Sequence, residues 1–438
     1  MIGAVGGFLS PARRRRFVVA LGAFHLLIFV VTATRPGWGY DTTSQLTDAG
    51  LFERLAVALR SPGGAPHVSY PPLAIGLIRI IGGAGLHTTM LRLLMLNALA
   101  DLTIVVVLTR AWSKHAAVWY LALSAPLLAF LVNGFDTIVA AIVITGVACI
   151  RRDRARSGAL LLTVAVFMKL WPVLLVGVLW AVGYRRAARW LCAFGALGLG
   201  MWIAATGFRG PVDVVTYRGS KGWHVESLPG VILGLARGEK SRYEQGSWRV
   251  GSPPPILGTL TTLIVVLSLV WLWRRVHRDR AFREPAIGMV SVASIATMLL
   301  GATLLSPQYL AWLFPFLAIA IVEERDAVPR LGIATAAGAE PERGAAPKRP
   351  LRSAAIAMTV INAMYVAAND LNNPDGMAVR IEALIRNVSI VLVVVACVRA
   401  SYCAAQARAT SATTSVYGSP LTSITTSSMV PVNANGAS

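Results

Sequence analysis

Long apolar runs separated by short clusters of basic residues dominate this 438-residue chain. Apolar residues make up 55% of it and charged residues only 14%, and many of the runs reach the roughly 17 residues that a helix needs to cross a hydrocarbon core. Because a bilayer offers no water to the backbone N–H and C=O groups, such segments must form helices. The sequence therefore predicts an all-α polytopic membrane protein.

The net charge of +21 would suggest a nucleic-acid ligand if the protein were soluble. Here the arginines and lysines gather in short clusters between apolar runs, such as 13–16, 151–156 and 274–283. Clusters of this kind mark the cytoplasmic loops of membrane proteins. We therefore expect the charge to set the orientation of the chain, with the lipid bilayer and no nucleic acid as its partner.

The apolar segments predict about twelve transmembrane helices once one segment is left out. If every apolar segment crossed the membrane, the basic clusters 151–156, 185–189 and 274–283 would all lie outside the cell, against the positive-inside rule. The segment 70–84 is the weakest candidate, because it is short, opens with two prolines and carries Arg79. Placing it as an interfacial helix on the outer face restores the pattern and leaves both termini in the cytoplasm.

This topology divides the chain into three parts. Residues 1–16 form a basic cytoplasmic N-terminus, residues 17–400 form the transmembrane domain, and the Ser/Thr-rich residues 401–438 are expected to be a disordered cytoplasmic tail. Two long loops, 35–87 and 207–253, fall on the outer face. The polar and irregular sequence therefore gathers on one side of the membrane, and we expect the site there.

The chain carries no sequence motif for a metal or a nucleotide cofactor. Its four cysteines lie in or beside apolar runs without paired spacing, so they indicate neither a disulfide framework nor a zinc site. The sequence has no P-loop and no Gly-x-Gly-x-x-Gly fingerprint. We therefore expect neither a metal nor a cofactor in the site.

The first outer loop holds three of the scarce acids, in the stretch GYDTTSQLTDAGLFERLAVAL. The leucines of this stretch recur at helical spacing, which predicts an amphipathic helix at the interface. Asp41 comes just before this helix, where two roles are open: a catalytic base, or a cap of the helix. Asp48 and Glu53 are expected to be solvated. Downstream, SYPPL predicts an extended entry into a helix, with Tyr70 as an interfacial aromatic residue over a cavity at membrane level.

Lys169, in FMKLWPVLL, lies between two apolar runs that are each too short to span comfortably. Pro172 breaks the helix at this point. A lysine at such a break is costly unless it lines a polar cavity. An anionic ligand such as a lipid phosphate is one explanation for it, and a lysine whose ammonium group reaches the interface is the other.

The second outer loop and one short turn supply the remaining candidates. Arg218 and His224 accompany aromatic residues in VDVVTYRGSKGWHVESLPG, and this mixture suits a sugar phosphate, because cations neutralise the phosphate while rings stack on the sugar. The turn LLSPQYLAWLFP places Gln308 and Tyr309 as polar groups lining a cavity. A solvated loop and ordinary turn chemistry remain the alternatives.

The order of these motifs resembles glycosyltransferase family 87. GYD, YPPL, NGFD, KLWP, HVES and SPQYLAWLFP follow one another within about residues 17–400, as in this family of GT-C membrane enzymes, which includes polyprenol-phosphate-mannose-dependent α-mannosyltransferases. The resemblance implies a GT-C-like bundle in the cell membrane with outer-face juxtamembrane helices. It also implies transfer of a sugar, with mannose the family expectation, from a polyprenyl-phosphate donor to a glycolipid or polysaccharide hydroxyl on the extracytoplasmic face, as in cell envelope biosynthesis.

The resemblance assigns roles to the candidate residues. The acid of the first outer loop, matched here by Asp41, is expected to act as the base of an inverting single displacement. Lys169 is expected to bind the donor phosphate. The other residues expected to bind the donor phosphate or its sugar are Tyr70, Arg218, His224, Gln308 and Tyr309.

Two other functions are compatible with a polytopic membrane protein. A transporter or flippase of a lipid-linked or anionic substrate would use Arg92, Asp101 and Lys169 as its substrate path, and it predicts inverted repeats. No such repeat is evident in the sequence. A structural membrane protein without catalysis is the third hypothesis.

Overall fold

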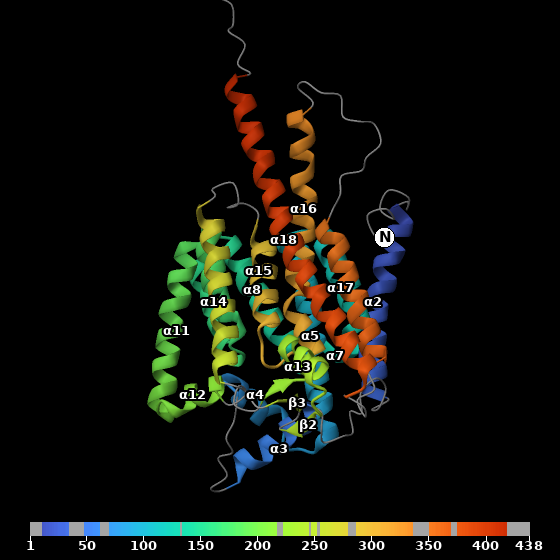
Figure 1. Ribbon diagram of the computed structural model, residues 1–438, viewed down its shortest axis with the longest axis vertical. Helices are drawn as coiled ribbons and strands as arrows, with labels where there is room; N and C mark the ends of the chain where they lie inside the picture. The colour runs from blue at the N-terminus through green and yellow to red at the C-terminus, as the bar shows by residue number, and fades with distance from the viewer. Residues whose placement is uncertain are drawn as a thin grey trace, which may run out of the picture.

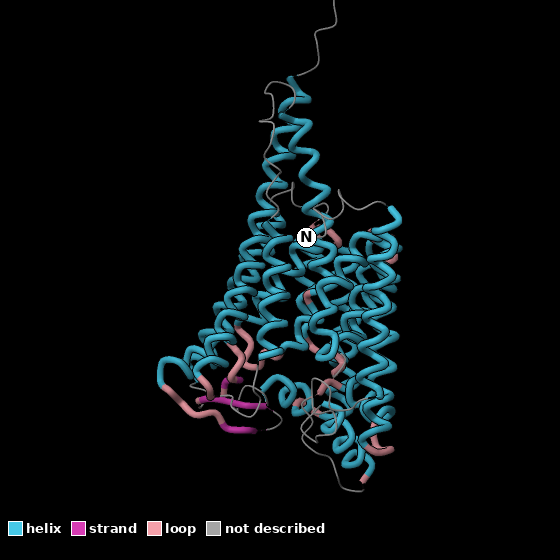
Figure 2. Tube along the Cα trace, turned by 90° about the vertical axis from the view of Figure 1, so that its right-hand side faces the viewer, coloured by secondary structure: helices cyan, strands magenta, loops and turns pink. Residues whose placement is uncertain are grey.

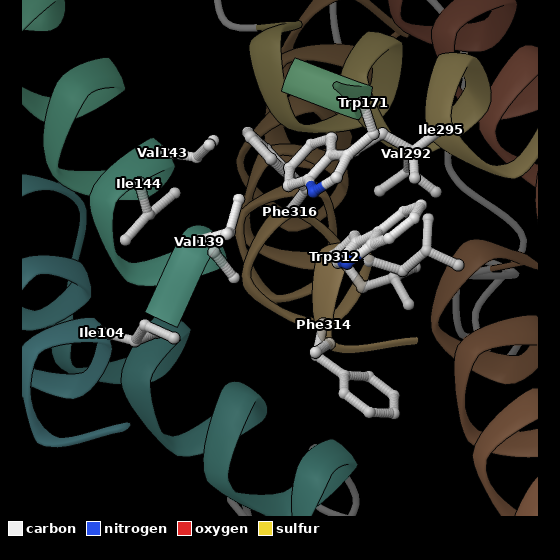
Figure 3. Packing of buried hydrophobic residues seen from close by; sticks show 14 of the residues in the cluster. Ile104, Val139, Val143, Ile144, Trp171, Val292, Ile295, Trp312, Phe314 and Phe316 are labelled. Carbon is white, nitrogen blue, oxygen red and sulfur yellow. The ribbon is translucent and has the colours of Figure 1, made fainter. Parts of the chain in front are cut away.

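The computed structural model is a bundle of helices that run roughly along one direction (Figure 1). The residues it describes are 11–34, 48–61, 70–131, 134–216, 222–244, 247–251, 255–278, 286–335, 350–368 and 375–417. Helix α8 packs against α5 and α9, and α16 packs against α6, α15 and α18. These contacts bury a continuous apolar core, part of which is shown in Figure 3.

The bundle combines long helices with short ones. The long helices are α2 (Pro11–Thr34), α5 (Leu86–Ala111), α11 (Arg185–Thr206), α14 (Pro255–Arg278), α16 (Phe314–Thr335), α17 (Pro350–Ala368) and α18 (Met377–Tyr417). The shorter elements are α6 (Lys114–Ser124), η1 (Ala125–Leu127), α7 (Leu128–Leu131), α8 (Asp136–Arg151), α9 (Ala155–Met168), η2 (Trp171–Leu174), α10 (Leu175–Ala181), α15 (Ile287–Leu300) and η5 (Pro307–Trp312).

Among the described residues, four helices are long and apolar enough to cross a membrane: Leu86–Ala111, Arg185–Thr206, Gly258–Arg278 and Met377–Arg399. Other apolar helices are shorter, such as α9 and α15 with 14 residues each, whereas an untilted span needs about 20. The chain is therefore a mainly helical membrane protein, and the number of about twelve spans stays a prediction.

Four short helices and a small sheet cover one end of the bundle, the lower end in Figures 1 and 2. We call it the loop end. The helices are α3 (Asp48–Arg60), α4 (Pro72–Ile81), α12 (Arg209–Thr216) and α13 (Leu228–Arg237). Helix α4, formed by the segment 70–84, has ten residues and is about 15 Å long. It is too short to cross a membrane, and its interfacial placement stays a prediction.

A small sheet accompanies the mainly helical fold. Strands β1 (Trp223–His224), β3 (Ser247–Val250) and β2 (Arg242–Glu244) pair antiparallel in that order within the second outer loop. Tyr243 lies opposite Trp248 in this sheet, and their rings meet edge to face at 5.4 Å. The strands have two to four residues each, so no run of alternating residues was long enough to predict them.

The opposite end of the bundle carries the start of α2 and the end of α18. Helix α18 continues to Tyr417, so the first residues of the tail predicted to be disordered are helical. The physical reason lies in its sequence, because alanines, Gln406 and Arg408 are good helix formers and extend an existing helix without a new nucleation step. Residues 418–438 lie outside the described part of the chain.

Two buried acids of α16 satisfy the ends of neighbouring helices at this opposite end. The carboxylate of Glu323 accepts hydrogen bonds from the backbone N–H groups of Gly288 and Met289, at the start of α15. Glu324 does the same for Leu351 and Arg352 at the start of α17. A helix N-terminus carries unpaired N–H groups and a partial positive charge, so each buried carboxylate stabilises the helix it caps.

A buried polar network joins α2 to the rest of the bundle. His25 Nδ1 lies 3.0 Å from Asp101 Oδ2, and its Nε2 lies 3.0 Å from the Leu121 carbonyl oxygen. The Tyr120 hydroxyl donates to the other oxygen of Asp101 at 2.6 Å. Asp101 therefore ties three helices together, which accounts for an acid in an apolar span without a transport function.

The juxtamembrane corner of α3, α4 and α5 is held by Glu53. Its carboxylate accepts hydrogen bonds from the N–H groups of Gly83 and Gly85 and from the Thr89 hydroxyl, at 2.6, 2.9 and 2.5 Å. Arg60 donates to the carbonyls of Gly82 and Gly83 on the same turn. Glu53 is thus a structural residue rather than the solvated acid that the sequence predicted.

Arg92 also serves this corner. Its guanidinium donates to the carbonyl oxygens of Ile80 and Ile81 at 3.3 and 3.1 Å. These carbonyls belong to the last turn of α4, where a helix leaves acceptors unpaired. Arg92 therefore caps α4 instead of lining a substrate path, which removes one residue from the transporter hypothesis.

We predict that Glu53→Gln destabilises the protein in a pH-dependent way. Burial alone would raise the pKa of the Glu53 carboxyl, but the hydrogen bonds from Thr89, Gly83 and Gly85 and the charge of Arg60 lower it below 4.5. A carboxyl whose folded pKa is depressed stabilises the fold above its unfolded pKa and loses that effect as the pH falls through the folded value. We expect a loss of about 1–3 kcal/mol at pH 7.

Thermal unfolding in detergent between pH 7 and pH 3 measures this loss. The melting temperatures of Glu53→Gln and wild type should converge at the acid end. Glu239→Gln is the control, since Glu239 forms an exposed ion pair with Arg237 and should differ little from wild type. An equal destabilisation at all pH values would contradict a role for the Glu53 charge.

Candidate active site

Lys169 lies at the loop end, where the chain breaks between two short apolar helices. Helix α9 ends at Met168, Lys169 has extended backbone angles, and η2 begins at Trp171 with Pro172 in its first turn. The Lys169 Nζ lies 2.5 Å from Asp136 Oδ1. The side chain of Asp136 is 1% exposed and that of Lys169 is 21% exposed, so the carboxylate is sealed inside while part of the lysine is accessible.

Aromatic side chains surround this ion pair. Trp312 Nε1 donates to Asp136 Oδ1 at 2.5 Å, and its ring stacks between those of Trp171 and Tyr309 at 5.2 and 4.5 Å. The Lys169 ammonium lies 4.6 Å from the Tyr309 ring centre and 5.1 Å from that of Trp312. Figure 3 shows Trp171 and Trp312 close together in the core beside α8. The lysine is therefore held by a carboxylate and two ring faces.

A second carboxylate, that of Asp48, approaches the pair from α3. Gln308 Nε2 donates to Asp48 Oδ2 at 3.3 Å. A Cβ atom placed on Gly134 would lie 2.9 Å from Asp48 Oδ2 and 3.1 Å from Asp136 Oδ2, so the two oxygens are at most about 6 Å apart. Glycine at position 134 thus lets two acids that are distant in the sequence come close to each other, and one of them binds Lys169.

Asp136 accepts two hydrogen bonds on the same oxygen. Lys169 and Trp312 both bind Oδ1, whereas Oδ2 is buried without a hydrogen-bond partner among the described residues. Asn97 supports the same segment by donating from its amide to the Gly134 carbonyl at 3.0 Å. Asp136 is the first residue of α8, and the partial positive charge of a helix N-terminus favours a carboxylate there.

Tyr70 packs in an aromatic row beside α3. It contacts Phe52 of α3 edge to face at 5.9 Å, and Phe52 stacks on Phe135 at 4.3 Å, with the two rings nearly parallel. Phe135 directly precedes Asp136. The aromatic row Tyr70–Phe52–Phe135 therefore fixes α3, and with it Asp48, against the start of α8.

His224 belongs to a separate cluster that joins the second outer loop to the bundle. Its backbone N–H donates to the Thr303 carbonyl at 2.9 Å, and its buried ring has a hydrogen bond with the backbone of Leu305. Glu226 forms a 2.6 Å ion pair with Arg386 of α18. The hydrogen bond from His224 to Thr303 holds β1 beside the turn that leads to Gln308 and Tyr309, and the Glu226 ion pair fixes the same segment to α18.

The motif HVESLPG forms a tight structural unit next to β1. Ser227 caps α13 by accepting a hydrogen bond from the Gly230 N–H, and the Glu226 carbonyl accepts one from the Asn387 amide at 3.1 Å. A Cβ on Gly230 would lie 2.0 Å from the His224 carbonyl oxygen, so only glycine fits there. Within the described residues, His224 thus takes part in the packing of the loop.

The structure brings some of the predicted residues together and leaves others undescribed. Lys169, Gln308 and Tyr309 lie in one cluster, whereas Tyr70 and His224 support it from two sides. Asp41 and Arg218 lie outside the described residues. Their predicted roles, and those of the residues in the cluster, stay predictions.

Sequence reasoning missed two acids of this cluster. Asp136 lies in the motif NGFD, which carried part of the family resemblance but was given no role of its own. Asp48 was expected to be solvated because it begins an amphipathic helix. The only signal for either was an acid at the boundary of an apolar run, and their partners Gln308 and Lys169 are too distant in sequence to reveal the contact.

No group of three or more His, Cys, Asp or Glu residues that could hold a metal ion occurs in the described part of the chain.

Fold and site together define a class: a helical membrane protein with a polar, charged cluster at one end of its bundle. The sequence profile of glycosyltransferase family 87 matches residues 68–307, which is more than half of the chain. The protein belongs to this family and is a membrane glycosyltransferase. No curated protein and no solved structure matches the chain.

We predict that Gly134→Ala lowers glycosyltransfer without unfolding the protein. The added methyl group would press on Asp48 and Asp136 at the distances given above, and such overpacking costs about 1–3 kcal/mol. Melting temperature and turnover measure the two effects. Gly76→Ala is the control, because a Cβ there meets nothing within 4 Å. Full activity in Gly134→Ala would mean that the spacing of the two acids is unimportant.

A second prediction concerns the pH dependence of stability. Burial lowers the pKa of His224 to about 4, with Glu226 opposing the shift and Arg386 and Arg249 adding to it. An unfolded histidine takes up its proton near pH 6.5, so the unfolded state binds more protons between pH 6.5 and about 4 and stability falls as the pH drops through that window.

Replacement by glutamine should remove this contribution. We expect the melting temperature of His224→Gln to fall less steeply than that of wild type between pH 6.5 and 4. His87→Gln, at an exposed histidine of α5, should follow the wild-type slope. Parallel curves for His224→Gln and wild type would show that His224 is not held neutral by the fold.

Proposed function

We propose that the protein transfers a sugar, mannose by the family expectation, from a polyprenyl-phosphate donor to the hydroxyl of a glycolipid or polysaccharide on the extracytoplasmic face. The observation that carries this proposal is the accessible ammonium group of Lys169, held at the loop end by the Asp136 carboxylate, with the Asp48 carboxylate at most about 6 Å from the other oxygen of Asp136. A cation for the leaving phosphate and a carboxylate for the acceptor proton are the two groups that an inverting transfer requires.

Lys169 is the proposed ligand of the donor phosphate. An ammonium group has three N–H donors, and one of them points to Asp136. The remaining exposed part can bind a phosphate oxygen and neutralise the charge that develops as the bond to the anomeric carbon breaks. A lipid phosphate stabilised in this way is already a good leaving group, so the proposed reaction includes neither a second acid nor a metal.

The proposed base is a carboxylate of the first outer loop. The family resemblance points to Asp41, whose surroundings the structure does not describe. Asp48, seven residues later, is described, and it is partly exposed and oriented by Gln308 in the same cluster as Lys169. Among the described residues we therefore propose Asp48 as the group that takes the acceptor proton, with Asp41 as the alternative given by the family resemblance. With either base, the proposed single displacement inverts the configuration at the anomeric carbon of the sugar.

The placement in the cell follows from the distribution of basic residues. The loop end carries few of the arginine and lysine clusters, so we place it outside, with both termini in the cytoplasm. At the membrane boundary the polyprenyl tail of the donor stays in lipid while its sugar reaches the carboxylates. The interfacial helices α3 and α4 then lie at the level of the lipid headgroups.

We predict distinct defects for three variants, assayed with purified protein, polyprenyl-phosphate mannose and a panel of glycolipid and polysaccharide acceptors. Asp48→Asn should lower kcat by about 100-fold or more, since a general base contributes that much. Lys169→Met should mainly raise the KM for the donor. Asp41→Asn should lower kcat only if Asp41 is the base.

The control and the contradicting outcomes are clear-cut. Asp153→Asn, at the turn between α8 and α9 away from the loop end, should retain wild-type activity. Full turnover in both Asp41→Asn and Asp48→Asn would remove the proposed base. Movement of the donor across liposome membranes without any covalent product would instead favour a flippase.

A further inference from the structure

We propose that Asp136 is a positioning residue that fixes Lys169 for the donor phosphate and does not itself touch the substrate. The inference rests on the phosphate-binding role proposed above for Lys169. It assigns a function to a buried acid that neither the family match nor the proposed reaction requires. The cluster that carries it consists of Asp136, Lys169, Trp312 and Tyr309.

The first argument is access. The Asp136 side chain is 1% exposed, whereas that of Lys169 is 21% exposed. A ligand that enters from the loop end can therefore reach the ammonium group without displacing the carboxylate behind it. Asp136 can therefore act on the ligand only through Lys169, which covers the carboxylate.

The second argument is the direction of the Asp136 hydrogen bonds. Both bonds end on Oδ1, from Lys169 and from Trp312. Because Trp312 donates to the same oxygen, the carboxylate cannot rotate away from the lysine without losing both contacts. Trp312 is itself packed between Trp171 and Tyr309, so the orientation of Asp136 is set by rigid aromatic rings.

The third argument concerns the freedom of a lysine side chain. A free lysine side chain samples many rotamers, and an unrestrained one at a break between helices would lose this freedom when it binds phosphate. Here Asp136 and the faces of Tyr309 and Trp312 restrict Nζ beforehand. A charged group that is ordered before binding gives tighter binding for the same contact.

The place of Asp136 in the fold suits this task. It is the first residue of α8, a 16-residue helix whose side chains line the core. A site group held by a rigid helix is more precisely placed than one on a loop. Lys169, by contrast, follows the last residue of α9 in extended conformation, so it needs an external anchor.

A double-mutant cycle tests the proposal. Donor KM and kcat are measured with polyprenyl-phosphate mannose for wild type, Asp136→Asn, Lys169→Met and the double variant. Removing an outer partner that orients a ligand-binding group typically lowers affinity about 10- to 100-fold, so we expect a rise of that size in the donor KM of Asp136→Asn. If Asp136 acts only through Lys169, the double variant behaves as Lys169→Met alone.

Two outcomes overturn the proposal. A further loss when Asp136→Asn is added to Lys169→Met would mean that Asp136 acts directly on substrate or base. A lower melting temperature in Asp136→Asn with an unchanged donor KM would mean that the pair is only structural. An unchanged donor KM in Lys169→Met would instead show that Lys169 does not bind the donor phosphate. That result would contradict the proposed function and, with it, this inference.

Two further variants keep the test decisive. Asp101→Asn is the matched control, since Asp101 is also a buried carboxylate with two bonded partners, His25 and Tyr120. It should lower the melting temperature and leave the donor KM of the folded protein unchanged. Asp136→Glu keeps the charge if Asp136→Asn does not fold. Its longer side chain should displace the ammonium group and raise the donor KM, and an unchanged KM there would contradict the proposal.

Discussion

The ends of helices are the main physical constraint on this structure, because each one leaves backbone groups without partners and a bilayer supplies no water to bind them. The chain has many short helices and therefore many ends. Charged side chains satisfy several of them: Glu53 at the start of α5, Arg92 at the end of α4, and Glu323 and Glu324 at the starts of α15 and α17. Most of these acids and bases are thus structural, which explains charges in an apolar protein without giving them a function.

Asp136 and Lys169 depart from this pattern in an informative way. Both lie at helix ends, yet their side chains bind each other instead of the backbone. One oxygen of Asp136 remains without a partner among the described residues, which is unfavourable for a buried carboxylate. The buried Glu226–Arg386 ion pair also includes a hydrogen bond to a backbone carbonyl. The Asp136 carboxylate instead accepts its hydrogen bonds from two side chains in the described part of the chain, and a functional requirement is the simplest reason for this arrangement.

The sequence predicted the helical membrane fold, the short helix within 70–84 and the break at Lys169, because each depends on local properties such as run length, prolines and charge. It did not predict the sheet, whose strands are too short to show a pattern, or the helical continuation of α18. The contact of Asp48 with Gln308 spans 260 positions, and no local signal reveals it. The family resemblance placed the motifs in order but could not show that Asp136 faces Lys169.

The second outer loop shows why such distant contacts matter for the site. His224 and Glu226 are close in sequence, yet one binds the turn at Thr303 and the other binds Arg386 on α18. The turn at Thr303 leads directly into η5, which carries Gln308, Tyr309 and Trp312. The buried ion pair of Glu226 therefore fixes the strand that supports this turn. His224 and Glu226 therefore support the element whose side chains contact Asp48 and Lys169.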